Sequence, residues 1–346
     1  MRTESLYLQS IGVHLPPVVT VRTAVERGWY PAEEEEYFRL TGAAVAGDVP
    51  APELALRAAR QAFDRSPATT PEDLELMLYA DVWHQGPEGW QPQYHLQQHL
   101  IPPDVLAVEL RHGCCGFFSA LQVSARYLRP EGGAALIVGA DNHGTPLVDR
   151  WRMIDGCIMG DAGCALLVAR EPGIAQVLSV NVVVLPEAEA VNDGGVPMFP
   201  PDATVGRPLD FKGRNQDFRA RLIETGGTAV LLAIQKTLME LVERTLDEAG
   251  VSLEKLRRVA FPHGRWDDLE QRGLNWLGLT LEDTTWVYGA SIGHLGVSDQ
   301  FVALDHLLAT RQVEPGDHVM LVGLGAGTTM ACAVLRILDV PGDSHG

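Results

Sequence analysis

The chain has 346 residues, of which 46% are hydrophobic and 21% are charged, so its composition is that of a folded protein and excludes a disordered one. Its 27 basic and 45 acidic residues leave a net charge of −18, which argues against nucleic acid or an anionic membrane as a partner. No apolar run approaches the roughly 18 residues that a membrane-spanning helix needs, so we expect no membrane association.

The five cysteines and eleven histidines bear on location and on metal binding. No CxxC pair occurs and the N-terminus shows no signal peptide, so we expect a cytoplasmic protein without a disulfide framework. No HExxH motif or paired histidine spacing is present, so no metal site is expected.

Short apolar runs alternate with longer amphipathic patterns along the chain. Strands are predicted over 74–83, 134–140, 164–169, 177–185, 257–262 and 318–324. Apolar residues spaced i, i+3, i+4 predict helices over 52–66, 116–130, 227–250 and 298–312. This alternation is typical of α/β layers around a buried sheet. Residues 186–217 are rich in Pro, Gly and Asp, and we expect them to form a long loop.

An internal repeat relates two pairs of predicted strands. Gly139 ends the run AALIVG and Gly323 ends VMLVG, and GCALLVA at 163–169 matches ACAVLRI at 331–337. Two packed copies of one βαβ-rich unit predict an α/β protein of five layers, α/β/α/β/α. We expect an N-terminal half over 1–172 and a C-terminal half over 173–346.

The motif RHGCCGFFSAL places Cys114 ahead of a glycine and an amphipathic helix. A thiol at a helix N-terminus faces the positive end of the helix dipole and unpaired N–H groups, which favour the nucleophilic thiolate. The structural alternative is a pair of small cysteines that fill core space.

The segment GASIGHLGVSD places His294 in a glycine-rich turn before a helix. Cys114 and His294 occupy similar places in the two halves, so pseudo-twofold packing predicts a Cys/His nucleophile–base pair at the centre. Asp299 follows His294 by five residues and can orient the ring only if Gly293 or Gly296 bends the chain first. The alternative is a surface histidine and an aspartate that favours the helix dipole.

Two further features concern ligand binding. His263 ends an apolar strand, at the edge where α/β proteins place ligands, although a core histidine is an equal alternative. The segment GLGAGTT at 323–329 lacks the last glycine of a dinucleotide loop, so we expect no nicotinamide site. We interpret it as a tight turn whose amides could bind an oxyanion.

Over nearly the whole chain, these motifs resemble the ketoacyl-acyl-carrier-protein synthase III family, which has the thiolase fold. SIGVHLPP is similar to the family's opening strand, EYFRLTG to its early helix, GCCGFFSAL to its nucleophile elbow, MGDAGCALLV to its F-G-D-G-A-G-A run, FPHGRWDDLE to its P-H-Q-A-N motif and IGHLGVSD to its G-N-T-S-A-A-S helix start. The resemblance implies that Cys114 is the nucleophile, that His263 is the family's histidine and that position 294 is the family's asparagine.

The chain departs from the family pattern at the base. His294 stands in place of the asparagine and Asp299 in place of a serine, which looks like a Cys-His-Asp set. Such a set suits acyl transfer to a hydroxyl, because a base must take the hydroxyl proton. The resemblance to an acyltransferase subgroup implies transfer from a carrier-protein or coenzyme A thioester, through acyl-Cys114, to a sugar, alcohol or carrier-protein acceptor in polyketide or antibiotic biosynthesis.

Two other functions stay open at this point. One is a decarboxylating 3-ketoacyl-acyl-carrier-protein synthase III that starts a polyketide or fatty acid chain. The other is a catalytically silent thiolase-fold partner. The residue at position 294 separates the first of these from acyl transfer.

The resemblance also implies further partners and pocket residues. Glu36 and Leu40 stand where the family clamps coenzyme A with Trp and Arg, which favours a carrier-protein donor. The thioester would be a substrate, with no permanently bound cofactor, and a homodimer is expected. The amides of Cys114 and Ala326 would form the oxyanion hole. Near the family's substrate tunnel lie Trp83, His84 and Trp90, which could shape the pocket or be core aromatics.

Overall fold

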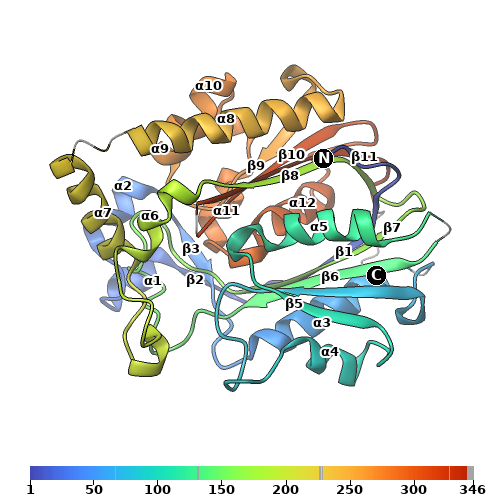
Figure 1. Ribbon diagram of the computed structural model, residues 1–346, viewed down its shortest axis with the longest axis horizontal. Helices are drawn as coiled ribbons and strands as arrows, with labels where there is room; N and C mark the ends of the chain where they lie inside the picture. Colours follow the sequence, from blue (N-terminus) through green and yellow to red (C-terminus); the bar gives the residue numbers. More distant parts are fainter. Residues whose placement is uncertain (67, 131, 226, 228, 327, 341–346) are drawn as a thin grey trace.

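The computed structural model describes residues 1–340 apart from 67, 131, 226, 228 and 327. Its centre is a mixed sheet of nine strands in the order β5-β4-β6-β7-β1-β8-β11-β10-β9 (Figure 1). The strands are β1 (Tyr7–His14), β4 (Leu74–Ala80), β5 (Leu106–Leu110), β6 (Ala134–Asp141), β7 (Ala162–Ala169), β8 (Ala175–Val184), β9 (Leu256–Ala260), β10 (His318–Gly325) and β11 (Thr329–Ile337).

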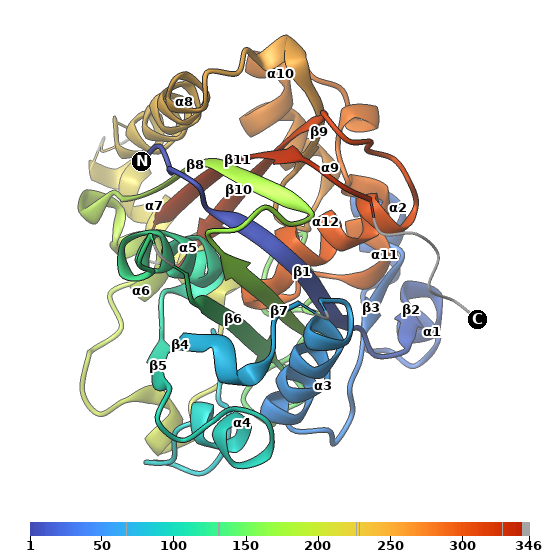
Figure 2. The same ribbon diagram turned by 90° about the vertical axis from the view of Figure 1, so that its right-hand side faces the viewer.

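The helices place this sheet in five layers, as predicted. Helix α3 (Ala51–Asp64) covers the outer face of β1, β6 and β7, and α8 (Ala229–Ala249) covers the outer face of β8 and β11 (Figure 2). Helices α5 (Gly116–Tyr127) and α12 (Asp299–Ala309) lie between the two parts of the sheet. The outer contact is close, because a Cβ on Gly12 of β1 would lie 2.0 Å from the carbonyl oxygen of Ala58 in α3.

The sequence repeat is visible as two antiparallel strand pairs. Strands β6 and β7 pair Gly139 with Cys164, and β10 and β11 pair Gly323 with Ala331. Both glycines leave room for the central helix: a Cβ on Gly139 would lie 3.0 Å from the Phe117 ring, and one on Gly323 would lie 2.8 Å from the Phe118 ring. The division of the chain at 172/173 stays a prediction.

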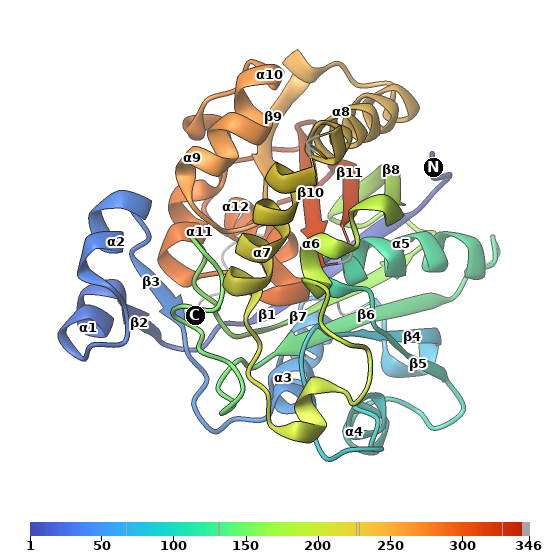
Figure 3. The same cartoon turned by 60° about the vertical axis from the view of Figure 1, so that its left-hand side comes forward.

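The remaining elements surround this body (Figure 3). They are β2 (Val18–Thr20), β3 (Gly42–Ala44), α1 (Val21–Glu26), α2 (Ala32–Phe38), α4 (Gln93–His99), α6 (Ala190–Asp193), α7 (Phe211–Thr225), α9 (Trp266–Leu269), α10 (Asn275–Leu277) and α11 (Trp286–Ile292). Across the described residues, we find no helix with the length and apolar character needed to cross a membrane.

The prediction of one long loop over 186–217 was wrong. The segment contains α6 and a 3₁₀ turn at Asp202–Val205, and α7 begins inside it at Phe211. Helix α7 escaped detection because it buries little more than Phe218 and so carries no apolar stripe. Residue 228 of the predicted helix 227–250, residue 327 and residues 341–346 lie outside the described residues.

Candidate functional site

The turn before α5 and the turn before α12 bring a thiol and an imidazole together at the centre of the molecule. Cys114 lies in a 3₁₀ turn, Gly113–Cys115, immediately before α5, and is half-buried. Its Sγ is 3.1 Å from Nε2 of His294, although 180 residues separate them in the chain. The sulfur of the adjacent Cys115 is buried, and burial raises its pKa well above the usual value. Of the two adjacent cysteines, Cys114 is therefore the one whose sulfur lies beside His294.

Two glycines, one before His294 and one between His294 and Asp299, bend the chain at this turn. Gly293 has φ +80° and Gly296 has φ +63°, a region that side chains other than glycine rarely adopt. The bend turns Asp299 back, so that its Oδ2 accepts a hydrogen bond from Nδ1 of His294. Backbone bonds at 2.8 Å with Ile158 and Gly160 hold His294 in place.

Asp299 is fully buried and its carboxylate is almost saturated by N–H groups. Oδ2 also accepts from the amide of His263 at 2.9 Å, and Oδ1 accepts from the amide of Leu295 at 2.5 Å. Burial alone would raise the pKa of Asp299, yet the charges of His263 and His294 and these bonds hold it below its usual value.

The charge on His294 follows from its two neighbours. Burial by itself would lower the pKa of His294, but the charges of Asp299 and Cys114 outweigh burial and hold it well above the usual value. The imidazole is therefore favoured in its charged form between the carboxylate of Asp299 and the sulfur of Cys114, an arrangement in which a thiolate–imidazolium pair can form.

His263 follows β9 and binds the same carboxylate. Its Nδ1 donates to the carbonyl of Gly293 at 2.9 Å and lies 3.2 Å from Oδ1 of Asp299. Because both neighbours are acceptors, Nδ1 carries a proton. Nε2 is buried and has no hydrogen-bond partner among the described residues.

The turn after β10 lies directly against the nucleophile turn. A Cβ on Gly113 would lie 3.5 Å from the amide nitrogen of Ala326, and one on Gly325 would lie 3.3 Å from the amide nitrogen of Cys114. The two amides expected to form an oxyanion hole therefore belong to turns in contact.

Comparison with known proteins follows this geometry. Residues 246–337 match the family described as 3-oxoacyl-[acyl-carrier-protein (ACP)] synthase III C terminal. A β-ketoacyl-[acyl-carrier-protein] synthase III of Syntrophomonas wolfei is 25% identical over 298 residues, which cover 84% of this chain and 83% of the relative. The solved structure of ChlB3, an acyltransferase, is 48% identical, with a TM-score of 0.92, and the match covers 96% of this chain and 98% of ChlB3.

The chain belongs to the ketoacyl-acyl-carrier-protein synthase III family. The synthase III of Aquifex aeolicus, at 18% identity and a TM-score of 0.77 over 96% of this chain and 99% of that one, shares its fold. The predicted thiolase fold is thus confirmed, and this synthase III-family protein is an enzyme of the acyl-transferring class. Enzymes of the family act on acyl thioesters of carrier protein or coenzyme A.

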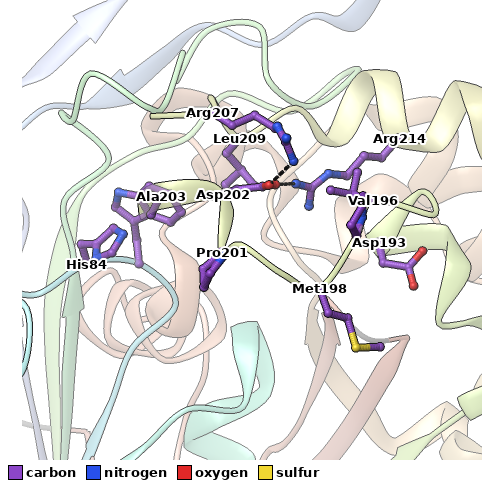
Figure 4. Close-up of a pocket in the computed structure, with 12 residues that line it drawn as sticks. His84, Asp193, Val196, Met198, Pro201, Asp202, Ala203, Arg207, Leu209 and Arg214 are labelled. Carbon is purple, nitrogen blue, oxygen red and sulfur yellow. Dashed lines mark hydrogen bonds and ion pairs between the residues drawn. The ribbon is translucent and has the colours of Figure 1, made fainter. Parts of the chain in front are cut away.

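Two of the three predicted pocket residues line a cavity in this synthase III-family enzyme. Trp83 and His84 face residues of the 193–214 segment across a cavity of about 320 Å³. In Figure 4, Asp202 lies between the guanidinium groups of Arg207 and Arg214, at 2.5 and 2.7 Å. Trp90 is not among the lining residues of this cavity and is 38% exposed.

The cavity wall adjoins the catalytic turns. Trp83 packs in one apolar cluster with Met159 and Cys157, and Met159 pairs through its backbone with His294. Cys157 donates from its thiol to the carbonyl of His263 at 3.6 Å, and burial raises its pKa to about 11. Nothing in the sequence singles out Cys157, because a lone cysteine in a turn carries no distinguishing pattern.

At the expected coenzyme A clamp, Leu40 is buried in the apolar cluster around Phe38 and Trp151, and Glu36 is exposed. The structure thus offers neither an aromatic face nor a cation at these two positions. Among the described residues, no group of three or more His, Cys, Asp or Glu is arranged to hold a metal ion.

Proposed function

We propose that this enzyme moves an acyl group from a carrier-protein or coenzyme A thioester, through an acyl-Cys114 intermediate, to a hydroxyl of a sugar or alcohol or to a carrier protein. The observation that carries the proposal is the continuous chain from Cys114 Sγ through His294 to the buried carboxylate of Asp299. A role in polyketide or antibiotic biosynthesis rests on the resemblance to the acyltransferase subgroup.

Acylation would begin at the thiolate–imidazolium pair. The Cys114 thiolate attacks the carbonyl carbon of the donor thioester, and a carbon–sulfur bond forms. The resulting oxyanion accepts hydrogen bonds from the amides of Cys114 and Ala326, and loss of one such donor would cost roughly 10²–10³ in rate. The bond to the pantetheine sulfur then breaks, and the departing thiolate takes the proton from Nε2 of His294.

Transfer would use the same imidazole as a base. After acylation His294 is neutral, with Nδ1–H still bonded to Asp299 and a free lone pair on Nε2. The acceptor hydroxyl gives its proton to Nε2 as its oxygen attacks the acyl carbon, and the Cys114 carbon–sulfur bond breaks. The kinetics would be ping-pong, because the first product leaves before the acceptor reacts.

His263 is the fourth member of the proposed site. Its Nδ1 proton is committed to Gly293 and Asp299, so Nε2 is the ring atom that remains for the substrate. The sequence left two roles open for His263, which are assistance to the first step and a hydrogen bond to the acyl carbonyl, and both use Nε2.

The hydrogen bond from His294 to Asp299 disfavours decarboxylative condensation, the alternative function. An enolate needs N–H donors at its oxygen, and in the family an asparagine amide supplies one. His294 replaces that amide by a ring whose Nδ1–H is bonded to Asp299. Carbon–carbon bond formation would therefore lack one of its donors at this position.

A homodimer is part of the proposal. Strand β5 is an edge of the sheet and exposes 48% of Leu106 and 41% of Val108. An exposed apolar edge strand is a template for pairing with a second strand. We propose that β5 of a second copy covers it.

Intact-protein mass spectrometry after exposure to a panel of acyl-carrier and acyl-coenzyme A donors tests the function directly. We expect one acyl adduct per chain, which an acceptor then removes, and no carbon dioxide release from a labelled malonyl donor. Carbon dioxide release with a lengthened acyl product would establish condensation instead. The absence of any adduct across the panel would establish a silent partner.

A further inference from the structure

Two buried carboxyl groups lie beside the catalytic turns and take no part in the proposed proton transfers. Asp141 is the last residue of β6, and Asp81 directly follows β4, which is parallel to β6 and pairs with it. Both residues are 0% exposed. Because neighbouring parallel strands end at the same edge of a sheet, the two carboxyl groups lie next to each other there.

Asp141 connects the wall of the cavity lined by Trp83 to the turn that carries His294, the proposed base. Its Oδ1 accepts hydrogen bonds from the amides of Val82 and Trp83, both at 2.9 Å. Its Oδ2 accepts one from the amide of Val297 at 3.3 Å. A Cβ on Gly296 would lie 2.1 Å from Oδ2, so the carboxylate packs against the bend itself. One side chain thus joins the cavity wall to the base turn.

Asp81 connects the same place to the nucleophile turn. Its Oδ1 lies 3.3 Å from Nε of Arg111, whose guanidinium also donates to the carbonyl of Val82 at 3.4 Å. Arg111 precedes Cys114 by three residues in the chain. Asp81 is therefore the point where the segment that leads to the nucleophile meets the β4 end.

We propose that Asp81 and Asp141 are a positioning pair that sets the register of Cys114 against His294. The connection runs from Arg111 through Asp81 and the Val82–Trp83 amides to Asp141 and the base turn. The inference rests on the proposed acyl transfer, and it adds two residues that touch neither the reacting atoms nor the substrate. Both half-reactions depend on the Cys114–His294 distance, so the pair affects both.

The charges around the pair make this register sensitive to pH. Burial first, and then the charges of Asp141 and Glu109, raise the pKa of Asp81 to about 8, whereas Arg111 lowers it. Burial raises the pKa of Asp141, while His143 and the three amide bonds lower it. Tyr79, whose own pKa is raised by burial and by these acids, stays neutral. Near pH 7 Asp81 is protonated. Above pH 8 it adds a second negative charge beside Asp141, and the repulsion loosens the turns.

Near-isosteric variants test the proposal. In Asp141→Asn an amide NH₂ group replaces one accepting oxygen. It then faces the backbone N–H groups of Val82 and Trp83 or that of Val297. We expect acylation and discharge of Cys114, followed by intact-protein mass, to slow together by about 10–100-fold, as misplacement of reacting groups by about 1 Å does. The matched control is Asp305→Asn. Asp305 is another largely buried aspartate and is paired with Arg65 at 2.6 Å, but it lies on α12 and not at the ends of β4 and β6.

The pH profile separates positioning from a general loss of stability. Asp81→Asn imitates the protonated acid, so at pH 7 the variant leaves the charge at position 81 unchanged. We therefore expect its rates of acylation and discharge to be within about threefold of wild type at that pH. Above pH 8 the wild type should lose activity, and Asp81→Asn should retain it. Three outcomes would overturn the inference. Asp141→Asn could react at wild-type rates, or it could slow no more than Asp305→Asn does. Asp81→Asn could also lose activity above pH 8 as the wild type does. A wild type without any acyl adduct would instead refute the proposed function.

Discussion

His263 and His294 bind the same carboxylate, that of Asp299, from two different segments of the chain. Nδ1 of His294 and the amide of His263 both donate to Oδ2, and Nδ1 of His263 lies 3.2 Å from Oδ1. The orientation of each ring therefore depends on one buried group, and the two Nε2 atoms remain for chemistry. The following predictions separate the contributions of these residues.

The two adjacent cysteines should differ completely in reactivity. Cys114→Ala should gain no acyl adduct, because the sulfur beside Nε2 of His294 is gone. Cys115→Ala should still gain one, since the Cys115 thiol is buried and lies 3.7 Å from the Thr329 carbonyl. Intact-protein mass after donor treatment measures both, and loss of the adduct in Cys115→Ala alone would contradict the assignment.

Removal of the base should trap the intermediate. In His294→Ala the acyl-Cys114 should form slowly and then persist, with transfer reduced by about 10²–10⁴-fold, the usual contribution of a general base. His306→Ala, a histidine of α12 stacked on Tyr288, is the control and should discharge normally. Normal turnover by His294→Ala would remove His294 from the mechanism.

Asp299→Asn should affect stability as well as rate. An amide NH₂ would face N–H groups that now bond an oxygen, and each lost buried bond costs about 1–3 kcal/mol. The pKa of Asp299 is lowered in the folded state, so its stabilising contribution is present above the unfolded value of about 4 and is lost as the pH falls below it.

Denaturant unfolding measures this difference. The gap between wild type and Asp299→Asn should be largest near neutral pH and should shrink under acid conditions. Asp305→Asn, on the same helix, should show a smaller loss because its partner Arg65 is partly exposed. A gap that is independent of pH would argue against an ionised Asp299.

Two variants of His263 distinguish its two nitrogens. An asparagine can still donate near the Nδ1 position to the Gly293 carbonyl, whereas a glutamine places an amide near the Nε2 position. If Nε2 accepts a proton in the first step, both His263→Asn and His263→Gln should acylate more slowly, by about 10–10²-fold, because neither is a base. Much faster acylation by His263→Gln would instead indicate a hydrogen bond to the acyl carbonyl.

The edge strand offers a test of the homodimer. Val108→Glu places a charge on β5, where a second copy would pair, and charged residues block such edges. We expect light scattering to report half the mass of the wild type. Val287→Glu, at a valine of α11 that is 74% exposed, should leave the mass unchanged. A wild type that is already monomeric would contradict the proposed dimer.

Much of the site was predictable because its residues lie in short, locally coded turns. The GCCGF segment leads from β5 into α5 and the GHLG segment leads from α11 toward α12, and helix starts of this kind carry recognisable glycines and small residues. The repeat of Gly139 and Gly323 then placed the two turns in matching positions of the two halves. These local patterns were enough to name Cys114, His294 and Asp299.

Other features could not be read from the sequence, because they depend on contacts between distant segments. Nothing in the chain order indicates that Asp141 accepts amides from both Trp83 and Val297, or that the Cys157 thiol bonds the carbonyl of His263. Helix α7 lacks an apolar stripe, so its place beside the cavity lined by Trp83 and His84 follows from tertiary packing.

The amino-acid sequence by itself determined the layered fold and pointed to Cys114 as the proposed nucleophile and His294 as its proposed base, because strand periodicity, glycine turns and the Cys and His positions are local properties. Only the tertiary structure decided which imidazole nitrogens are free and which carboxyl groups hold the turns in register. Those properties depend on hydrogen bonds and burial, which exist only once the two halves have packed together.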